Sequence, residues 1–409
     1  MFHPAINLLL TFGLIIVLLR KKVQTGLVML CAGLVLGLLF KVDFLSQIFT
    51  LKRAIITPVF LQLGIALNII MFLEHVMRTK GYLGKTMAAL KCLIPSSKIN
   101  LMILPAFLGL LPSPGGAAFS APLVAEAGRG LSLSPEDHSQ INYWFRHVWE
   151  FFIPMYPGVI LASQLLEIPV GKISLMLAPF FFISVPLGYY LYIRQIETPP
   201  GLKETAATSD AKRKGLMKLL AGVWPVVVIV FTVLIFKTDV SLTVTVVLIL
   251  LLIINRYQLP ELKKLWQESF SLSIMLLIAG ILFFKEMLAT SGVIQWLPVY
   301  LKSLGVPDFL VVVCLTFFVA FAIGLSQGYV AATFPLLIGI IGTGPQLNPG
   351  ALLLAYISGF VGIMLSPVHL CLFITVDYFK ADLIKVWRSV VLPGVVFILT
   401  ALVLAVIWK

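Results

Sequence analysis

Charged side chains are scarce in this chain of 409 residues: they make up 11% of it, whereas hydrophobic residues make up 60%. A soluble domain carries about one-quarter charged residues. With so few charges the chain cannot cover a water-exposed surface, which excludes an ordinary soluble enzyme or binding module. A membrane protein is predicted instead, with about a dozen segments, since one crossing takes about 20 residues.

Acidic residues are scarcer than basic ones, at 17 against 30, and the net charge is +13. The basic residues lie in short loops between apolar runs and form no single patch, which argues against nucleic-acid binding. Loop charges of this kind set membrane orientation. About three times as many lysines and arginines fall on one side as on the other, which predicts that both termini lie outside the cell.

Catalytic and cofactor motifs are absent from the sequence, which contains no His-Glu-x-x-His, no P-loop and no dinucleotide-binding glycine fingerprint. The four cysteines lack metal-ligand spacing and lie in or beside apolar runs, so they are predicted to be small packing residues. These are Cys31, Cys92, Cys314 and Cys371. We therefore expect no enzyme, no metal site and no bound cofactor, with Na⁺ or H⁺ as the coupling ion of any transport.

Twelve apolar runs are present, and two of them contain turn residues at their centres. The runs are 5–19, 24–40, 56–77, 99–127, 140–165, 173–193, 217–236, 240–255, 268–288, 306–342, 348–378 and 389–408. The run 99–127 is interrupted at Leu111–Gly116 and the run 306–342 at Leu325–Gly328. Proline and glycine clusters break helices. The sequence thus predicts an all-α membrane protein of ten crossings and two re-entrant helical hairpins.

An internal repeat relates the two halves of the chain at an offset of 213 residues. The matching pairs are Ser113 and Ser326, Gly115 and Gly328, Pro122 and Pro335, Tyr143 and Tyr356, Pro154 and Pro367, and Lys172 and Lys385. Each half has five crossings, an odd number, so the second half is predicted to be inverted. Inverted repeats with broken helices are typical of secondary transporters.

This repeat divides the chain into five parts. Residues 1–95 and 217–305 are expected to form the scaffold helices of the two repeats. Residues 96–195 and 306–409 are expected to carry the hairpins and transport helices. The polar stretch 196–216 is interpreted as a cytoplasmic linker.

The hairpin tips are the first candidate substrate site. Helix N-termini there would offer free N–H groups and about half a positive charge, and glycine admits an anion close to the backbone. The alternative is that the glycines only turn the chain. The candidate residues are Ser113, Pro114, Gly115, Gly116, Ser326, Gln327 and Gly328.

A proline is predicted inside the helix that follows each hairpin. Pro154 and the pair Ser366 and Pro367 occupy equivalent places. A proline frees a backbone carbonyl one turn earlier and kinks the helix, so these residues are candidates for the substrate site. A purely structural kink is the alternative.

Arg146 is the most unusual residue within an apolar run. An arginine at mid-membrane costs about 2.5–3.5 kcal/mol, so it is expected to bind a carboxylate or phosphate. His147, Glu150 and His369 are candidates for the coupling ion or proton. The alternative is a self-neutralising pair of Arg146 and Glu150, four residues apart on one helical face near the interface.

The order of five crossings and one hairpin, repeated inverted, resembles the ion-transporter superfamily of citrate, gluconate, lactate and dicarboxylate carriers, and within it a prokaryotic integral-membrane family. The resemblance implies a homodimer in the prokaryotic inner membrane, with fixed scaffold domains and elevator-type transport domains. Sodium–dicarboxylate members carry Ser-Asn-Thr at both tips. Here the tips read Ser113-Pro114-Gly115 and Ser326-Gln327-Gly328, and only the serines agree.

The function expected from these features is secondary active transport of a small organic anion, driven by a proton or sodium gradient. Two alternatives stay open at this point. The chain could be the membrane subunit of a binding-protein-dependent carrier, or it could translocate lipids with anionic headgroups. Membrane lipids and the anionic substrate are the expected partners, and nucleic acid is not.

Overall fold

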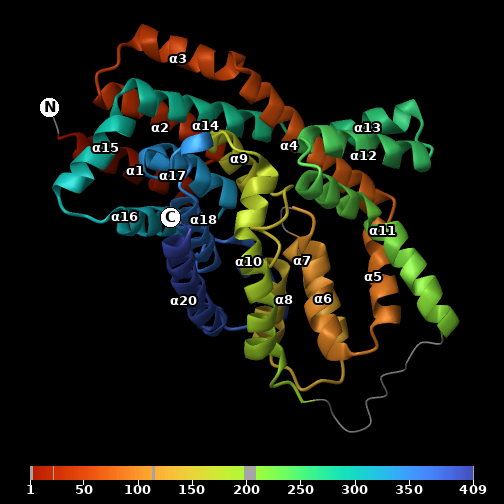
Figure 1. Ribbon diagram of the computed structural model, residues 1–409. Helices are drawn as coiled ribbons and strands as arrows, with labels where there is room; N and C mark the ends of the chain where they lie inside the picture. Colours follow the sequence, from red (N-terminus) through yellow and green to blue (C-terminus); the bar gives the residue numbers. More distant parts are fainter. Residues whose placement is uncertain (1–2, 22, 113–115, 198–208, 409) are drawn as a thin grey trace.

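The computed structural model describes residues 3–21, 23–112, 116–197 and 209–408, and these residues form helices and connecting loops without a strand (Figure 1). The first half contains α1 (Pro4–Arg20), α2 (Thr25–Leu39), α3 (Phe44–Ile56), α4 (Pro58–Thr79), α5 (Tyr82–Leu93), α6 (Ser97–Gly109), α7 (Ala117–Ala127), α8 (Pro135–Arg146), α9 (Pro157–Leu166) and α10 (Val170–Gly188), which continues into a π-helical turn, η1 (Tyr189–Ile193). An all-helical fold was predicted, and it is confirmed for the described residues.

The second half repeats this order of ten α-helices. It contains α11 (Ser209–Ile235), α12 (Val240–Ile254), α13 (Leu259–Ser269), α14 (Leu272–Thr290), α15 (Val293–Ser303), α16 (Asp308–Ile323), α17 (Ser326–Ile341), α18 (Pro349–Met364), α19 (Leu370–Phe379) and α20 (Leu383–Ile407), with a short 3₁₀ turn, η2 (Gly344–Gln346), before α18. The bounds of α9 and α19 differ by 213 residues at both ends. That offset is the one found in the sequence repeat.

Backbone conformations recur at equivalent positions as well. Glu167 and Lys380, which end α9 and α19, are non-glycine residues with left-handed φ angles of 56° and 55°. Gly81 and Gly292, which precede α5 and α15, have φ angles of 70° and 73°. Residues with side chains rarely adopt positive φ. Their recurrence shows that the two halves share local structure as well as helix order.

The packing between the halves is reciprocal. Helix α9 of the first half packs against α17 of the second, and α19 of the second packs against α7 of the first. Likewise α2 packs along α14 and α4 along α12. Figure 1 shows α2 and α14 side by side, with α3 at the outer edge. The hairpin of each half is thus held by a helix of the other half.

Five helices are long and apolar enough to cross a membrane: Pro58–Thr79, Val170–Ile193, Asp210–Ile235, Leu272–Thr290 and Leu383–Ile407. Ten further helices are apolar but shorter, at 10–17 residues. These lengths agree with a multi-pass membrane protein. The ten crossings, the inversion of the second half and the location of the termini stay predictions.

Four helices were not predicted: α3, α5, α13 and α15. They are amphipathic and lie outside the central parts of the apolar runs, so a search for continuous apolar sequence passes over them. In α3, Asp43 caps the helix by accepting a hydrogen bond from the Ser46 backbone N–H at 2.9 Å. Phe44, Leu45 and Phe49 on the same helix are exposed. Such a helix suits a membrane interface.

The apolar runs 99–127 and 306–342 are each broken near the predicted turn. Helix α6 ends at Gly109 and α7 begins at Ala117, while α16 ends at Ile323 and α17 begins at Ser326. The two arms of each pair contact each other. Gly324 closes α16 with a φ of 70°, a conformation that glycine adopts without strain.

The runs 140–165 and 348–378 were predicted to be continuous helices kinked by proline, and this prediction is wrong. Each run forms two helices, α8 and α9 or α18 and α19, joined by non-helical turns. Pro154 and Pro367 lie in those turns. A proline that removes a backbone donor and clashes with the preceding turn can end a helix as readily as bend it.

The predicted linker 196–216 is shorter than expected. Helix α11 begins at Ser209, so Lys212, Arg213 and Lys214 lie on its first turns. Asp210 and Lys214 form an ion pair at 2.8 Å, four residues apart on this helix. Residues 198–208 lie outside the described part of the chain.

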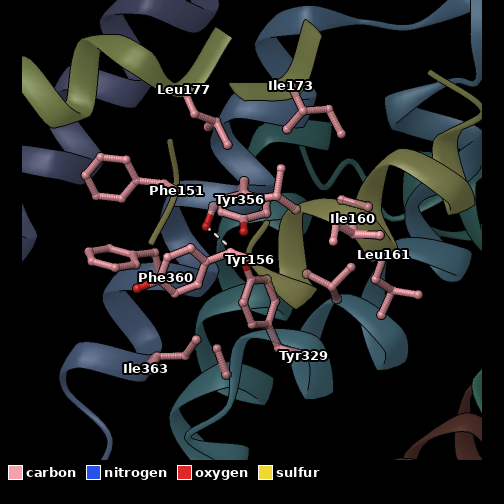
Figure 2. Close-up of a cluster of buried hydrophobic side chains, with 14 of the residues drawn as sticks. Phe151, Tyr156, Ile160, Leu161, Ile173, Leu177, Tyr329, Tyr356, Phe360 and Ile363 are labelled. Atoms are coloured by element: carbon pink, nitrogen blue, oxygen red, sulfur yellow. Dashed lines mark hydrogen bonds between the residues drawn. The ribbon is translucent and has the colours of Figure 1, made fainter. Parts of the chain in front are cut away.

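A cluster of buried aromatic side chains joins the two halves (Figure 2). Tyr329 and Tyr356 are almost fully buried, and the Tyr329 hydroxyl donates a hydrogen bond to the Tyr356 carbonyl at 3.1 Å. Phe151 from the turn after α8 packs edge-on against Phe360 of α18, with ring centroids 5.0 Å apart. This packing fixes the broken helices relative to each other and so positions the candidate site.

Candidate functional site

Three helices begin at one small cavity of about 170 Å³. They are α9, which starts at Pro157, α17, which starts at Ser326, and α19, which starts at Leu370. The cavity is lined by Pro112, Arg146, His147, Glu150, Tyr156, Pro157, Leu325, Ser326, Gln327, His369, Leu370 and Cys371. Each helix N-terminus contributes about half a positive charge. The converging starts therefore create a region that favours negative charge.

Arg146 is the last residue of α8 and is buried, with 6% of its surface exposed. Its Nη1 atom donates to the carbonyl of Leu108 at 3.5 Å. The guanidinium group lies against Gly116, the residue that caps α7, where a Cβ atom would be 2.6 Å from Cζ of Arg146. Glycine at 116 is thus required for this close approach.

A larger cavity of about 610 Å³ lies between helices α4 and α5 on one side and α6 and α7 on the other. Its walls are mainly apolar, with Met87, Leu111 and Phe119 among the lining residues. Arg146 lines this cavity as well as the smaller one. One buried guanidinium group is therefore shared by two adjacent cavities.

His147 and His369 meet in the wall of the small cavity, with their Nε2 atoms 3.1 Å apart. The Nδ1 atom of His147 lies 2.6 Å from the carbonyl oxygen of Tyr143, and that of His369 lies 2.8 Å from the carbonyl oxygen of Gly324. A carbonyl oxygen only accepts, so each Nδ1 carries a hydrogen and donates it. Both rings are thereby fixed in orientation and tautomer.

The backbone carbonyls at the helix breaks are satisfied by side chains. In a membrane interior an unpaired carbonyl costs several kcal/mol, so non-helical backbone needs such partners. The donor and acceptor pairs are Tyr143 Oη and Met364 O, Tyr156 Oη and Gly109 O, Ser366 Oγ and Phe321 O, and Trp387 Nε1 and Leu365 O. These hydrogen bonds tie the irregular segments together around the cavity.

Six predicted site residues line the small cavity, namely Arg146, His147, Glu150, Ser326, Gln327 and His369. Gly116 instead lines the larger cavity. Pro154, Gly328, Ser366 and Pro367 are not among the residues that line either one. Ser113, Pro114 and Gly115 lie outside the described residues. Whether any of these residues binds a substrate or coupling ion stays a prediction.

One geometric expectation about Arg146 and Glu150 is wrong. The two residues were placed on one helical face, but α8 ends at Arg146 and Glu150 lies in the turn that follows. Both side chains line the cavity, Arg146 from the last position of the helix and Glu150 from the turn. Gly109 lies so close to the end of α8 that a Cβ atom there would clash with the carbonyl of Arg146.

Sequence reasoning missed Cys371 and Tyr156, which both line the small cavity. Cys371 follows His369 by two residues at the start of α19. The closeness of these two residues to Pro367 could have indicated a site in the sequence. Tyr156 carries no such signal. Its hydroxyl reaches the carbonyl of Gly109 only because α6 and the turn after α8 are packed together.

Comparison with known proteins gives a family and distant structural likenesses. The crystal structure of the Alcanivorax borkumensis YdaH transporter, described as having an unusual topology, matches with a TM-score of 0.48 and 12% identity over 96% of this chain and 98% of that chain. At that distance it carries no inference about this protein. No curated protein matches the sequence.

The family comparison covers almost the whole chain. The model that matches residues 5–407 is described as a protein of unknown function (DUF401). It is not a model of the ion-transporter superfamily, so membership of that superfamily stays a prediction. Since the match extends over both halves and over the helices that the structure describes, the chain belongs to the DUF401 family.

Proposed function

We propose that this protein is a secondary active transporter that moves a small organic anion of the carboxylate type across the membrane. The observation that carries the proposal is the buried Arg146, which lines two adjacent cavities. A buried guanidinium group binds carboxylates through paired hydrogen bonds. The helix starts at Pro157, Ser326 and Leu370 add further positive potential at the same place.

We propose that the two halves form an inverted repeat, whose mechanical consequence supports a transport function. The reciprocal packing of α7 on α19 and α17 on α9 is the pattern that a two-fold axis in the membrane plane would produce. Two halves related in this way can exchange conformations and open a central site alternately to each side. We propose that scaffold helices in 1–95 and 217–305 stay fixed while the hairpins and helices in 96–195 and 306–409 move, as in an elevator.

The coupling ion, Na⁺ or a proton, is proposed to be held beside Glu150. Glu150 is buried, with 8% of the residue's surface exposed, and it lines the same cavity as Arg146. His147 and His369 form the neighbouring wall. An acidic group in this position gives the substrate anion and the coupling cation adjacent sites, so that binding of one would favour binding of the other. Inner-membrane location and a homodimer complete the proposal.

Uptake into proteoliposomes tests the function. The purified protein would be given a panel of labelled carboxylates with an imposed proton gradient, with a sodium gradient, and with neither. We expect uptake of at least one carboxylate that depends on one gradient. Absence of gradient-dependent flux across a broad panel would contradict the proposal.

The role of Arg146 is tested by the variant Arg146→Lys, which keeps the charge but removes the planar pair of donors. Uptake is expected to fall by about tenfold or more, because one good charge-assisted hydrogen bond contributes about 1.5–3 kcal/mol. Arg194→Lys is the matched control. Arg194 is exposed and stacks over Tyr190 at 5.2 Å, so its replacement should leave uptake unchanged.

A second candidate function is translocation of anionic amphiphiles, such as lipids. The larger cavity favours it, since its walls are mainly apolar and it contains Arg78, Lys91 and Arg146. An acyl chain could occupy the apolar part while the headgroup meets the arginines. Flipping of a fluorescent anionic lipid in the same vesicles, with no carboxylate uptake, would favour this function over the first.

A further inference from the structure

Three side chains that can bind metal ions converge at the small cavity. The ligand atoms of His147, His369 and Cys371 all lie within 4.8 Å of one another. His147 follows α8 in the first half, whereas His369 and Cys371 begin α19 in the second half. Two imidazoles and a thiolate form a ligand set that suits Zn²⁺. Their spacing along the chain does not predict a site, because the halves meet only in the folded protein.

The hydrogen bonds of the two histidines orient their lone pairs toward each other. Each Nδ1–H donates to a backbone carbonyl, of Tyr143 or of Gly324. In the neutral rings both Nε2 atoms then carry a lone pair, and these atoms are 3.1 Å apart. Two lone pairs at this distance repel unless a proton or a metal cation lies between them. Donation of the second ring nitrogen to a carbonyl is also the usual support of a metal-binding histidine.

The distance between the two histidine nitrogens is close to that of a tetrahedral ion, and the sulfur would have to approach them. Zn–N bonds of about 2.0–2.1 Å at a tetrahedral angle place two nitrogens roughly 3.3–3.4 Å apart. The observed 3.1 Å between His147 and His369 differs from this by a few tenths of an ångström. A Zn–S bond of about 2.3 Å requires nitrogen and sulfur to be about 3.5 Å apart. The ligand atom of Cys371 lies within 4.8 Å of those of both histidines, so ion binding must draw the sulfur closer by up to about 1.3 Å.

Cys371 is also well placed to supply a thiolate. It is the second residue of α19, in the first turn of the helix. The N-terminus of a helix stabilises a thiolate, which is the form that binds metals. Ion binding would release the thiol proton to solvent. With three protein ligands the fourth position stays open toward the cavity that Glu150 and Arg146 also line.

We propose that His147 Nε2, His369 Nε2 and Cys371 Sγ form a binding site for a thiophilic transition-metal ion of the Zn²⁺ class, which links the two halves of the molecule. The site does not depend on the transport function proposed above. If the protein binds no metal, the proposal that Arg146 binds a transported anion still stands. If the protein transports no anion, the proposed metal site still stands.

The test uses the full-length protein in detergent, stripped of metal by a chelator and titrated with Co²⁺ as a spectroscopic probe. We expect one Co²⁺ per chain, with the near-ultraviolet absorption of a thiolate–cobalt bond and the visible bands of tetrahedral cobalt. Added Zn²⁺ should displace the Co²⁺ and abolish both signals. Titration that ends without a thiolate–cobalt band would overturn the proposal.

Two variants test the ligands, and each has a matched control. Cys371→Ser and His369→Ala are expected to weaken Co²⁺ binding by more than about tenfold, since even outer partners of metal ligands change affinity by about 10–100-fold. Cys314→Ser replaces a half-buried cysteine of α16, and His138→Ala replaces a histidine whose Nδ1 also meets a carbonyl, that of Ser134 at 3.0 Å. Both controls should bind Co²⁺ as the unaltered protein does.

The controls also allow a conclusion when a variant gives an unexpected result or does not fold. If the thiolate–cobalt band persists in Cys371→Ser, or if Cys314→Ser abolishes it, the assignment of Cys371 is wrong. If His369→Ala does not fold, the nearly isosteric Cys371→Ser still decides the matter, together with displacement by Zn²⁺ in the unaltered protein.

Discussion

The guanidinium group of Arg146 occupies the space that a Cβ atom on Gly116 would need. At the equivalent positions of the second half, 213 residues later, the large residue and the glycine have exchanged places. There the ring of Tyr329 occupies the space beside Gly359, where a Cβ atom would be 2.6 Å from Cδ2 of the ring. A large side chain meets a glycine at both places, but it comes from α8 in one half and from α17 in the other.

Replacement of Gly116 by alanine is expected to displace Arg146 and leave the fold intact. The clash falls on the end of a long, flexible side chain, which can move. Misplacement of a binding group by about 1 Å can cost up to about 10²-fold in rate. Carboxylate uptake in proteoliposomes should therefore fall by about tenfold or more, while the Tm in detergent changes little.

Gly13→Ala is the control for Gly116→Ala, because a Cβ atom at Gly13 would meet nothing within 4 Å. Normal uptake by the Gly116→Ala protein would show that the position of Arg146 does not matter for transport.

Gly359→Ala is expected to lower stability more than Gly116→Ala does. The Tyr329 ring is fully buried and its hydroxyl is held by the Tyr356 carbonyl, so the ring cannot move aside. Overpacking of this kind costs about 1–3 kcal/mol. The free energy of unfolding, measured in mixed micelles, should decrease by this amount.

A double-mutant cycle tests whether this loss of stability comes from the contact between residue 359 and Tyr329. Tyr329→Ala also destabilises the protein by leaving a cavity, yet it removes the clash with residue 359. The cost of combining it with Gly359→Ala should thus be less than the sum of the two single effects. Additive costs would mean that the ring and the added methyl group do not meet.

Tyr143→Phe is expected to loosen the contact between the halves. The Tyr143 hydroxyl donates to the carbonyl of Met364, the last residue of α18, at 2.9 Å, and both residues are buried. Loss of one such hydrogen bond costs about 0.5–1.5 kcal/mol, and the orphaned carbonyl adds to this. The measurement is thermal unfolding in detergent. Tyr189→Phe, at a half-exposed tyrosine, should leave Tm unchanged.

Acidification is expected to weaken the contact of α8 with the loop before α20, through Glu136. Hydrogen bonds from its own backbone N–H and from that of Asp382 lower the pKa of this carboxyl group. A depressed folded-state pKa adds stability above the unfolded value of about 4.3, and that stability is lost as pH falls through the folded pKa.

A pH series of Tm values from 6 to 3 tests this expectation. Glu136→Gln should flatten the decrease in Tm below about pH 4, because it removes the titrating group. Asp210→Asn is the control, since Asp210 forms an exposed ion pair with Lys214, and such pairs contribute little. Equal slopes for Glu136→Gln and the unaltered protein would contradict the expectation.

Part of the candidate site could be predicted from local sequence. The break before Ser326 follows from glycine beside a polar pair within an apolar run, and α17 does begin at Ser326. Arg146 was singled out because an arginine within an apolar run is costly. The amphipathic helices α3 and α13 were missed, since their apolar residues recur at helical spacing and form no continuous run.

The ends of α8 at Arg146 and of α18 at Met364 could not be predicted from the sequence. A proline is compatible both with a kinked helix and with a helix end. At the break after Met364, donors from elsewhere in the chain, Tyr143 and Trp387, satisfy the carbonyls of Met364 and Leu365 that the break leaves free. Without those partners the continuous helix would be the better solution in a membrane.

The sequence by itself determined the apolar helices, the two broken runs and the offset of 213 residues, because burial of apolar side chains and helix breaking act over a few neighbouring residues. Only the tertiary structure decided that His147 meets His369 and Cys371, and that Gly116 leaves room for Arg146. Those contacts join residues from separate helices. Their distances depend on how α7, α8 and α19 pack together, and no local pattern records that packing.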